Sequence, residues 1–231
     1  NFSKVTLAAS LALSSLIIPA PLAQAGPDDG KMIATRAHID GPKTFWENNN
    51  FNLYVEAPRQ GVTQNLDPSK TAIWVGKGYS GTDNPAQQYI FTVPDLQEAS
   101  FLGKPGDNLY MTPSLPMGNH DPAWVGFGAD TDIPSEKFRD GSFSLDMLDV
   151  KGPGQVEMFR FDETANNNSA FQRLLSSVDP GFHSTPLKPG THTHNYTTFT
   201  KPGRYEITYR TVARAKDGST IESLSLIHIS E

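Results

Sequence analysis

The chain contains no cysteine, no run of basic residues and none of the short motifs that mark common catalytic sites. Without cysteine no disulfide can form, so the hydrophobic core must stabilise the fold, helped by any bound metal. The net charge of −6, without clustered Lys and Arg, argues against a nucleic-acid groove. No His-Glu-x-x-His helix, Gly-x-Ser-x-Gly elbow, phosphate-cradling loop or dinucleotide fingerprint is present, so we predict a protein that is not an enzyme.

Residues 1–25 have the composition of a secretory signal peptide. Lys4 precedes an apolar run over residues 5–18, and Ala23 and Ala25 supply the small side chains of a cleavage site. The run is short for a membrane span, and no cysteine could carry a lipoprotein acyl chain. We therefore predict a signal peptide over residues 1–25, truncated at its start, and a secreted bacterial protein whose mature chain begins at Gly26.

Residues 224–231 are similar to the in-frame translation of a common sequencing-library adapter. We interpret them as an artefact and expect them to lie outside the fold. An ordinary apolar β-strand is the alternative interpretation. Since no linker rich in Pro, Gly or Ser divides the rest of the chain, we predict a single domain over residues 26–223.

Short apolar segments separated by turn signals recur along the chain. The 19 Gly and 18 Pro, with 10% aromatic residues, favour many short strands joined by turns. This pattern predicts an all-β fold, an antiparallel immunoglobulin-like β-sandwich with a long insertion loop between Thr112 and Arg139. Residues 169–178 give the only helical periodicity. The predicted strands are 32–39, 51–56, 71–75, 89–93, 108–111, 143–150, 155–161, 192–200 and 204–213.

The last two predicted strands flank the sequence Lys201-Pro202-Gly203. Pro fixes φ and Gly accepts a positive φ, which suits the two central positions of a type II turn. We therefore expect these strands to pair as an antiparallel hairpin.

Two histidines at i and i+2 give the strongest signal of a functional site. Side chains two apart in a strand leave from one face, so His192 and His194 present their imidazoles side by side. His38 and Asp40 repeat this spacing. Imidazole with a carboxylate suits Zn²⁺, and Mn²⁺ or Fe²⁺ would fit if more oxygen ligands joined. We predict that His38, His192 and His194 converge on one metal ion, with Asp40 or His120 completing the site.

Other interpretations stay open. The spacing is also compatible with two exposed strand histidines beside a turn, and His120 lies in a turn-type string that favours an ordinary loop position. The alternative functions are a metal-free adhesion or scaffold module of the cell surface and a metal-dependent hydrolase. A hydrolase needs an open coordination position and a general base, whereas a binding site closes with four protein ligands.

Several segments follow one another in the order of a known family. They are His38-Ile39-Asp40, Phe101-Leu102-Gly103-Lys104-Pro105-Gly106, Asp121-Pro122-Ala123-Trp124-Val125-Gly126-Phe127, Asp149-Val150-Lys151-Gly152-Pro153-Gly154 and the stretch from Gly190 to Tyr205. Together these segments resemble the actinobacterial surface-anchored domain, also called choice-of-anchor M. The resemblance spans residues 29–222, and one departure is that Asn195-Tyr196-Thr197 stands where the family has x-Asn-Trp.

The resemblance implies an exported cell-surface domain of a kind often encoded beside metal-type ABC transporters. We therefore expect capture of a metal, or its handover to such a transporter, as the function. The resemblance also implies a C-terminal anchor that is missing from this sequence and through which the protein would contact cell wall or membrane.

Overall fold

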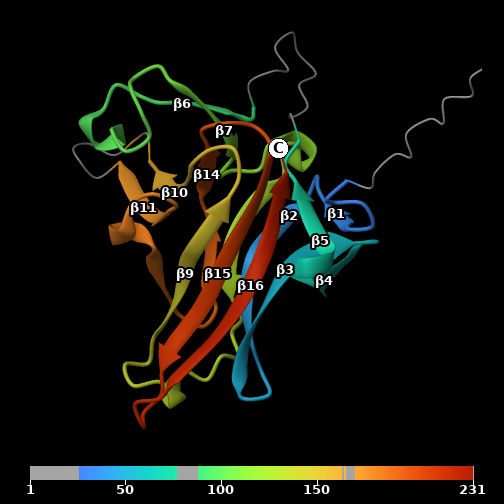
Figure 1. Cartoon of the computed structure of the whole chain (residues 1–231), viewed down its shortest axis with the longest axis vertical. Coiled ribbons are helices and arrows are strands. Elements are labelled where there is room, and N and C mark those ends of the chain that lie inside the picture. The colour runs from blue at the N-terminus through green and yellow to red at the C-terminus, as the bar shows by residue number, and fades with distance from the viewer. Residues whose placement is uncertain (1–25, 77–87, 163, 165–169, 231) are drawn as a thin grey trace, which may run out of the picture.

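The computed structural model describes residues 26–76, 88–162, 164 and 170–230, which form three β-sheets in a β-sandwich (Figure 1). The predicted all-β class is therefore confirmed. The predicted signal peptide, residues 1–25, lies outside the described residues. Among those described, no helix has the length and apolar character needed to cross a membrane.

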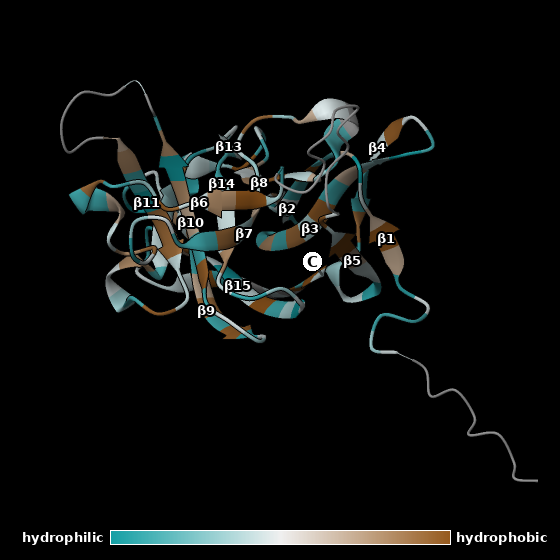
Figure 2. Ribbon diagram, turned by 90° about the horizontal axis from the view of Figure 1, so that it is seen from above, coloured by the Kyte–Doolittle hydropathy of each residue, from teal (hydrophilic) through white to brown (hydrophobic). Residues whose placement is uncertain are grey.

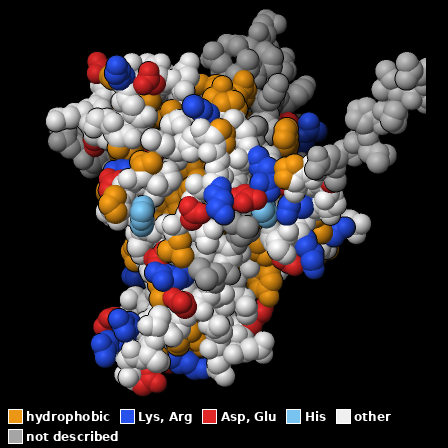
Figure 3. Space-filling model, in the orientation of Figure 1, with side chains coloured by type: hydrophobic (Ala, Val, Ile, Leu, Met, Phe, Trp, Pro, Cys, Tyr) orange, Lys and Arg blue, Asp and Glu red, His pale blue; other side chains and the backbone are white. Residues whose placement is uncertain are grey.

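One layer is a six-stranded sheet with the order β1-β5-β16-β15-β9-β12. In β15 the side chains of Tyr205, Ile207 and Tyr209 are fully buried and alternate with polar residues, as the sequence predicts for a strand with one solvated face. Acidic and basic side chains are intermixed on the face of the molecule drawn in Figure 3. The strands are β1 (Met32–Ala34), β5 (Thr71–Trp74), β16 (Thr220–Ser230), β15 (Arg204–Arg214), β9 (Phe143–Lys151) and β12 (Ser184–Leu187).

Two five-stranded sheets pack against this layer, with the orders β13-β8-β2-β3-β4 and β11-β10-β14-β7-β6. In both Figure 1 and Figure 2, β10 and β11 lie at one side of the molecule, and β1, β4 and β5 at the other. The strands are β13 (His192–His194), β8 (Trp124–Ala129), β2 (His38–Glu47), β3 (Asn50–Arg59), β4 (Val62–Leu66), β11 (Phe171–Ser176), β10 (Val156–Phe161), β14 (Tyr196–Phe199), β7 (Asn108–Thr112) and β6 (Ile90–Thr92).

A single main core joins the three sheets. It includes Ile39 from one five-stranded sheet, Phe199 from the other, and Tyr205 from the six-stranded sheet. The rings of Phe199 and Tyr205 pack with centroids 4.7 Å apart. A smaller cluster around Phe91 and Phe159 draws its residues from β6, β7, β10 and the segment between β6 and β7.

The predicted hairpin between residues 192–200 and 204–213 is wrong. β14 pairs with β7 and β10, whereas β15 pairs with β9 and β16. The Pro202-Gly203 turn therefore carries the chain between two sheets instead of joining neighbours in one. Turn chemistry indicates where the chain reverses, but it does not determine which sheet receives the next strand.

The helical periodicity of residues 169–178 also misleads, because Phe171–Ser176 forms strand β11. The register with β10 shifts between Met158 and Phe159, so that Leu174 is an extra residue in the ladder. This bulge buries both Leu174 and Leu175 and breaks the alternation expected of a strand.

The segment predicted as an insertion loop contains β8, which pairs in parallel with β2 and in antiparallel fashion with β13. Two further parallel pairs join β5 to β1 and to β16, so the sandwich is not purely antiparallel.

Residues 224–230 complete β16 instead of lying outside the fold. β16 lies between β15 and β5, and Ile227 and Ile229 are buried in the main core. The expectation that the fold excludes this segment is therefore wrong, because its apolar alternation suits a central strand. The adapter origin of the segment stays a prediction.

Candidate metal centre

Three neighbouring strands, β13, β8 and β2, position the candidate site. Ile39 and Val125 are buried in the main core, so their neighbours in sequence occupy the opposite face of the sheet. That outer face carries His38 and Asp40 from β2 and His192 and His194 from β13, because residues at i and i+2 share a face.

Two glycines on the middle strand leave room for side chains from the flanking strands to meet. A Cβ atom on Gly126 or Gly128 would lie 3.6 Å from a carboxylate oxygen of Asp40. A Cβ on Gly126 would also collide with the carbonyl oxygen of Thr193, and one on Gly128 would lie 2.8 Å from the carbonyl oxygen of Thr191. Glycine within a strand marks such close approaches.

The three histidines predicted to converge do lie together. The ring centroid of His38 is 4.9 Å from that of His192 and 5.1 Å from that of His194, and the last two are 4.4 Å apart. One possible ligand atom from each ring lies within 4.8 Å of the other two, so the group could hold a metal ion. This juxtaposition confirms the predicted convergence across two strands that are far apart in sequence.

Asp40 lies against this group. One carboxylate oxygen is 3.4 Å from Nε2 of His38, and the other is 3.2 Å from Nδ1 of His192. The residue is fully buried, and among the described residues neither carboxylate oxygen has a hydrogen-bond partner. Buried Nε2 of His38 and Nδ1 of His194 likewise have no hydrogen-bond partner within that part of the chain.

The electrostatics of the site favour the neutral imidazoles of His38 and His194. Burial, followed by repulsion from His192, lowers the pKa of both His38 and His194 below the ordinary value of 6.5. Burial also raises the pKa of Asp40, although His192 and Lys43 oppose this shift. Lys43 itself pairs with Glu56 on β3 at 2.7 Å. Neutral imidazoles have the free lone pairs that a metal ion requires.

Trp124 forms one wall of the site. Its ring stacks on that of His194 with centroids 3.9 Å apart and an interplanar angle of 12°, and it meets His38 edge-on at 4.8 Å. The indole N–H donates to the carbonyl oxygen of Ser114 at 3.0 Å, which fixes the ring. His120 stacks on the same indole at 5.9 Å. It lies outside the three-histidine group, and its role as a ligand stays a prediction.

Asn195 directly follows β13, the strand that carries two of the histidines. It is almost fully buried, and its amide donates to the carbonyl oxygen of Tyr196 and to Oγ1 of Thr197. These contacts hold the point at which the chain leaves β13 for β14 in the other five-stranded sheet. The site therefore lies beside the seam between the two sheets.

The three histidines could hold a metal ion, and the distances expected for zinc show what a tetrahedral site would require. Zn–N bonds of about 2.0–2.1 Å place neighbouring ligand nitrogens about 3.3 Å apart. The ligand nitrogens, which lie within 4.8 Å of one another, must therefore approach by on the order of 1 Å. Small side-chain rotations allow such a movement. The His192 side chain is 42% exposed and has room to rotate. Three imidazoles and one carboxylate are a donor set that suits zinc.

Sequence reasoning identified the ligand-type residues but missed the parts that bring them together. The glycines of the middle strand, and Trp124 with them, fall in the segment that the sequence predicts to be an insertion loop. The alternation Trp124-Val125-Gly126-Phe127-Gly128 carried the signal, because it combines a strand period with two positions that lack a side chain.

No family model matches this chain, and neither a curated protein nor a solved structure matches it. The resemblance to the actinobacterial surface-anchored domain stays a prediction carried by the sequence segments alone.

Proposed function

We propose that this protein is an exported cell-surface domain that captures a transition metal, with zinc as our first choice. The observation that carries the proposal is the buried carboxylate of Asp40, which has no hydrogen-bond partner among the described residues and lies between the imidazoles of His38 and His192. An isolated buried carboxylate is costly, and buried charges are normally paired or coordinate a metal. A divalent cation would supply the missing charge.

The choice of zinc follows from the donor set. Imidazole nitrogens suit Zn²⁺, and sites of this type bind Zn²⁺ more tightly than Mn²⁺ or Fe²⁺. Asp40 serves either as the fourth ligand or as an acceptor that orients the ring of His38 or His192. In the first case four protein ligands close the site, which favours binding over hydrolysis.

Location and partner are parts of the same proposal. The signal-like composition of residues 1–25 and the resemblance to a surface-anchored domain support export to the cell surface. The same resemblance supports components of a metal ABC transporter as the recipients of the ion. Handover predicts that a purified metal-binding component of such a transporter takes zinc from the loaded domain faster than a chelator does at the same concentration.

Metal analysis of the purified protein tests the proposal. After zinc loading and desalting, we expect about one equivalent per chain, and His192→Ala or His194→Ala should each remove it while the near-UV circular dichroism persists. His183→Ala is the matched control, because His183 lies outside the three-histidine group. Undiminished zinc in both site variants, or no zinc in the wild type, would contradict the proposal and favour the metal-free adhesion module.

The hydrolase alternative makes a separate prediction. If Asp40 is not a ligand, a water molecule completes a three-histidine site and becomes a nucleophile near neutral pH. Spectra of the cobalt-substituted protein separate the two arrangements. A pH-dependent change of the cobalt absorption bands near neutral pH would indicate bound water and support hydrolysis, whereas pH-independent bands would support a closed site.

A further inference from the structure

A pocket of about 400 Å³ lies directly beside the three-histidine group, and His194 is part of its lining. Its other walls come from Arg160 and Phe161 on β10, Gln172 on β11 and Leu115 from the segment before β8. Its volume lies within the range of small-molecule sites. The pocket thus joins a potential metal ligand, a cationic side chain and apolar surface.

The pocket continues past Arg160. A second pocket of about 630 Å³ shares Arg160 and Gln172 with the first and extends to Lys188 and Thr193. It lies among β11, β12 and β13, each of which is an edge strand of its sheet. We call the two pockets together the seam groove. It extends from His194 to Lys188.

Arg160 is a cation of this groove that has no carboxylate partner among the described residues. Its Nη1 donates to Oε1 of Gln172 at 3.5 Å, and within the described residues no carboxylate forms an ion pair with it. Asp162, also in the lining, accepts hydrogen bonds from the backbone N–H and hydroxyl of Thr164.

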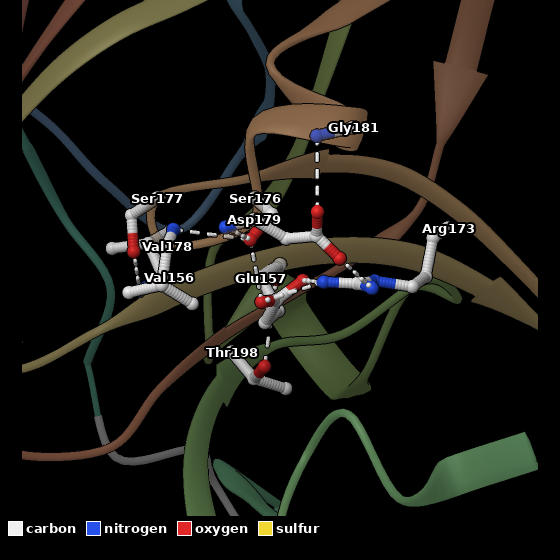
Figure 4. A network of polar contacts seen from close by, with 9 residues as sticks. All are labelled: Val156, Glu157, Arg173, Ser176, Ser177, Val178, Asp179, Gly181 and Thr198. Atoms are coloured by element: carbon white, nitrogen blue, oxygen red, sulfur yellow. Dashed lines mark hydrogen bonds and ion pairs between the residues drawn. The ribbon is translucent and has the colours of Figure 1, made fainter.

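Arg173, a second arginine that lines the groove, is already paired with two carboxylates of the protein. Its guanidinium donates to both carboxylate oxygens of Glu157 at 3.1 Å and to Asp179 at 2.7 Å. Ser176 donates to the same Glu157, and the whole network is drawn in Figure 4. Arg173 therefore braces the wall of the groove, whereas Arg160 has its charge free for a ligand.

We propose that the seam groove binds a small carboxylate-bearing ligand, with Arg160 as its anchor. A guanidinium matches a carboxylate through two parallel hydrogen bonds, and Gln172 supplies an amide beside it. A second carboxylate on the ligand would extend either toward Lys188 or toward an ion held by His194. The contact between the second carboxylate and a bound ion rests on the proposed metal function, whereas the anchoring of the first carboxylate by Arg160 does not.

Calorimetric titration with succinate tests the anchor in metal-free protein. We expect wild type to bind succinate and Arg160→Gln to bind at least tenfold more weakly. Arg59→Gln is the matched control, because Arg59 is exposed at the end of β3 and lies outside the groove lining. Since Arg160 is also exposed, its substitution should leave the fold intact, and Gln172→Ala provides a second variant with reduced affinity.

Three results would overturn the inference: no heat of succinate binding to wild type, equal affinity in Arg160→Gln and wild type, or tighter binding of inorganic phosphate than of succinate. Repeating the titration on protein with measured zinc content separates the two proposals. If zinc binds without changing the affinity for succinate, only the proposed contact between the second carboxylate and the metal ion is contradicted. Succinate binding that depends on Arg160 in a protein that takes up no zinc supports the groove and contradicts the metal function.

Discussion

Replacing Asp40 with asparagine should change stability and metal affinity in opposite directions. The substitution keeps the shape of the side chain but removes a charge that is fully buried and has no hydrogen-bond partner in the described part of the chain. Without metal, the new amide can donate to Nε2 of His38 or Nδ1 of His192, which lie 3.4 and 3.2 Å from the present oxygens. The metal-free fold should therefore become more stable.

The magnitude follows from the cost of an unsatisfied buried group, about 1–3 kcal/mol. For a domain of this size, each kcal/mol raises the melting temperature by about 2–4 °C. Zinc affinity should fall about 10–100-fold if Asp40 orients a ligand, and further if it binds the ion itself. That loss corresponds to about 1.4–2.7 kcal/mol of binding free energy.

Thermal unfolding at pH 8 with a chelator present measures the first effect, and competition with a zinc-binding dye measures the second. Asp146→Asn is the matched control. Asp146 is buried like Asp40 but accepts two hydrogen bonds from Arg210, so its replacement should destabilise the fold by about 1–2 kcal/mol and leave zinc affinity unchanged. If Asp40→Asn destabilises the metal-free fold and leaves zinc affinity intact, the reasoning is refuted.

Three further predictions concern pH, the middle strand and the last strand. Because the pKa values of His38 and His194 are lowered in the fold, the unfolded chain binds protons more readily. The metal-free protein should therefore be most stable above pH 6.5, and its free energy of unfolding should fall as the pH drops through 6.5 toward the pKa values of these two histidines in the folded state. In urea melts, the free energy of unfolding of a His38→Asn/His194→Asn variant should depend less on pH. Gly126→Ala should displace β13, lower stability by more than about 2 kcal/mol and abolish zinc binding, whereas Gly118→Ala, which meets no atom within 4 Å, should be neutral in both assays. Deleting residues 224–231 should prevent folding, since it removes Ile227 and Ile229, each contributing about 1.5–3 kcal/mol of burial; a truncated protein with an unchanged melting temperature would show that β16 is dispensable.

Local patterns predicted the fold class and the ligand-type residues, because both depend on short-range periodicity. The alternation of Tyr205, Ile207 and Tyr209 is sufficient to identify a buried strand face, and the i, i+2 spacing is sufficient to place His192 and His194 together. The convergence of His38 with them followed from joining two such pairs into one hypothesis. The sequence around Gly126 and Gly128 carries the signal of a strand, but it does not indicate that this strand, β8, lies between β2 and β13.

The errors arose where long-range pairing overrides a local signal. A bulge in β11 gave Leu174 and Leu175 the spacing of a helix, and the turn at Pro202-Gly203 was assigned to a hairpin although it connects two layers. The groove at Arg160 was also beyond sequence reasoning, because β10 and β13 meet there only through the arrangement of separate sheets. Sheet order is a global property, and these short segments do not encode it individually.

The strand that carries His192 and His194 has only three residues and pairs on one side alone. A short edge strand held by few backbone hydrogen bonds opens at a free-energy cost far below that of global unfolding. An ion bound there would link β13 to β2 across the glycines of β8. Local opening of β13 would remove two ligands in one movement while the sandwich stays folded. The dissociation rate of the ion would then be set by fraying of this single edge strand.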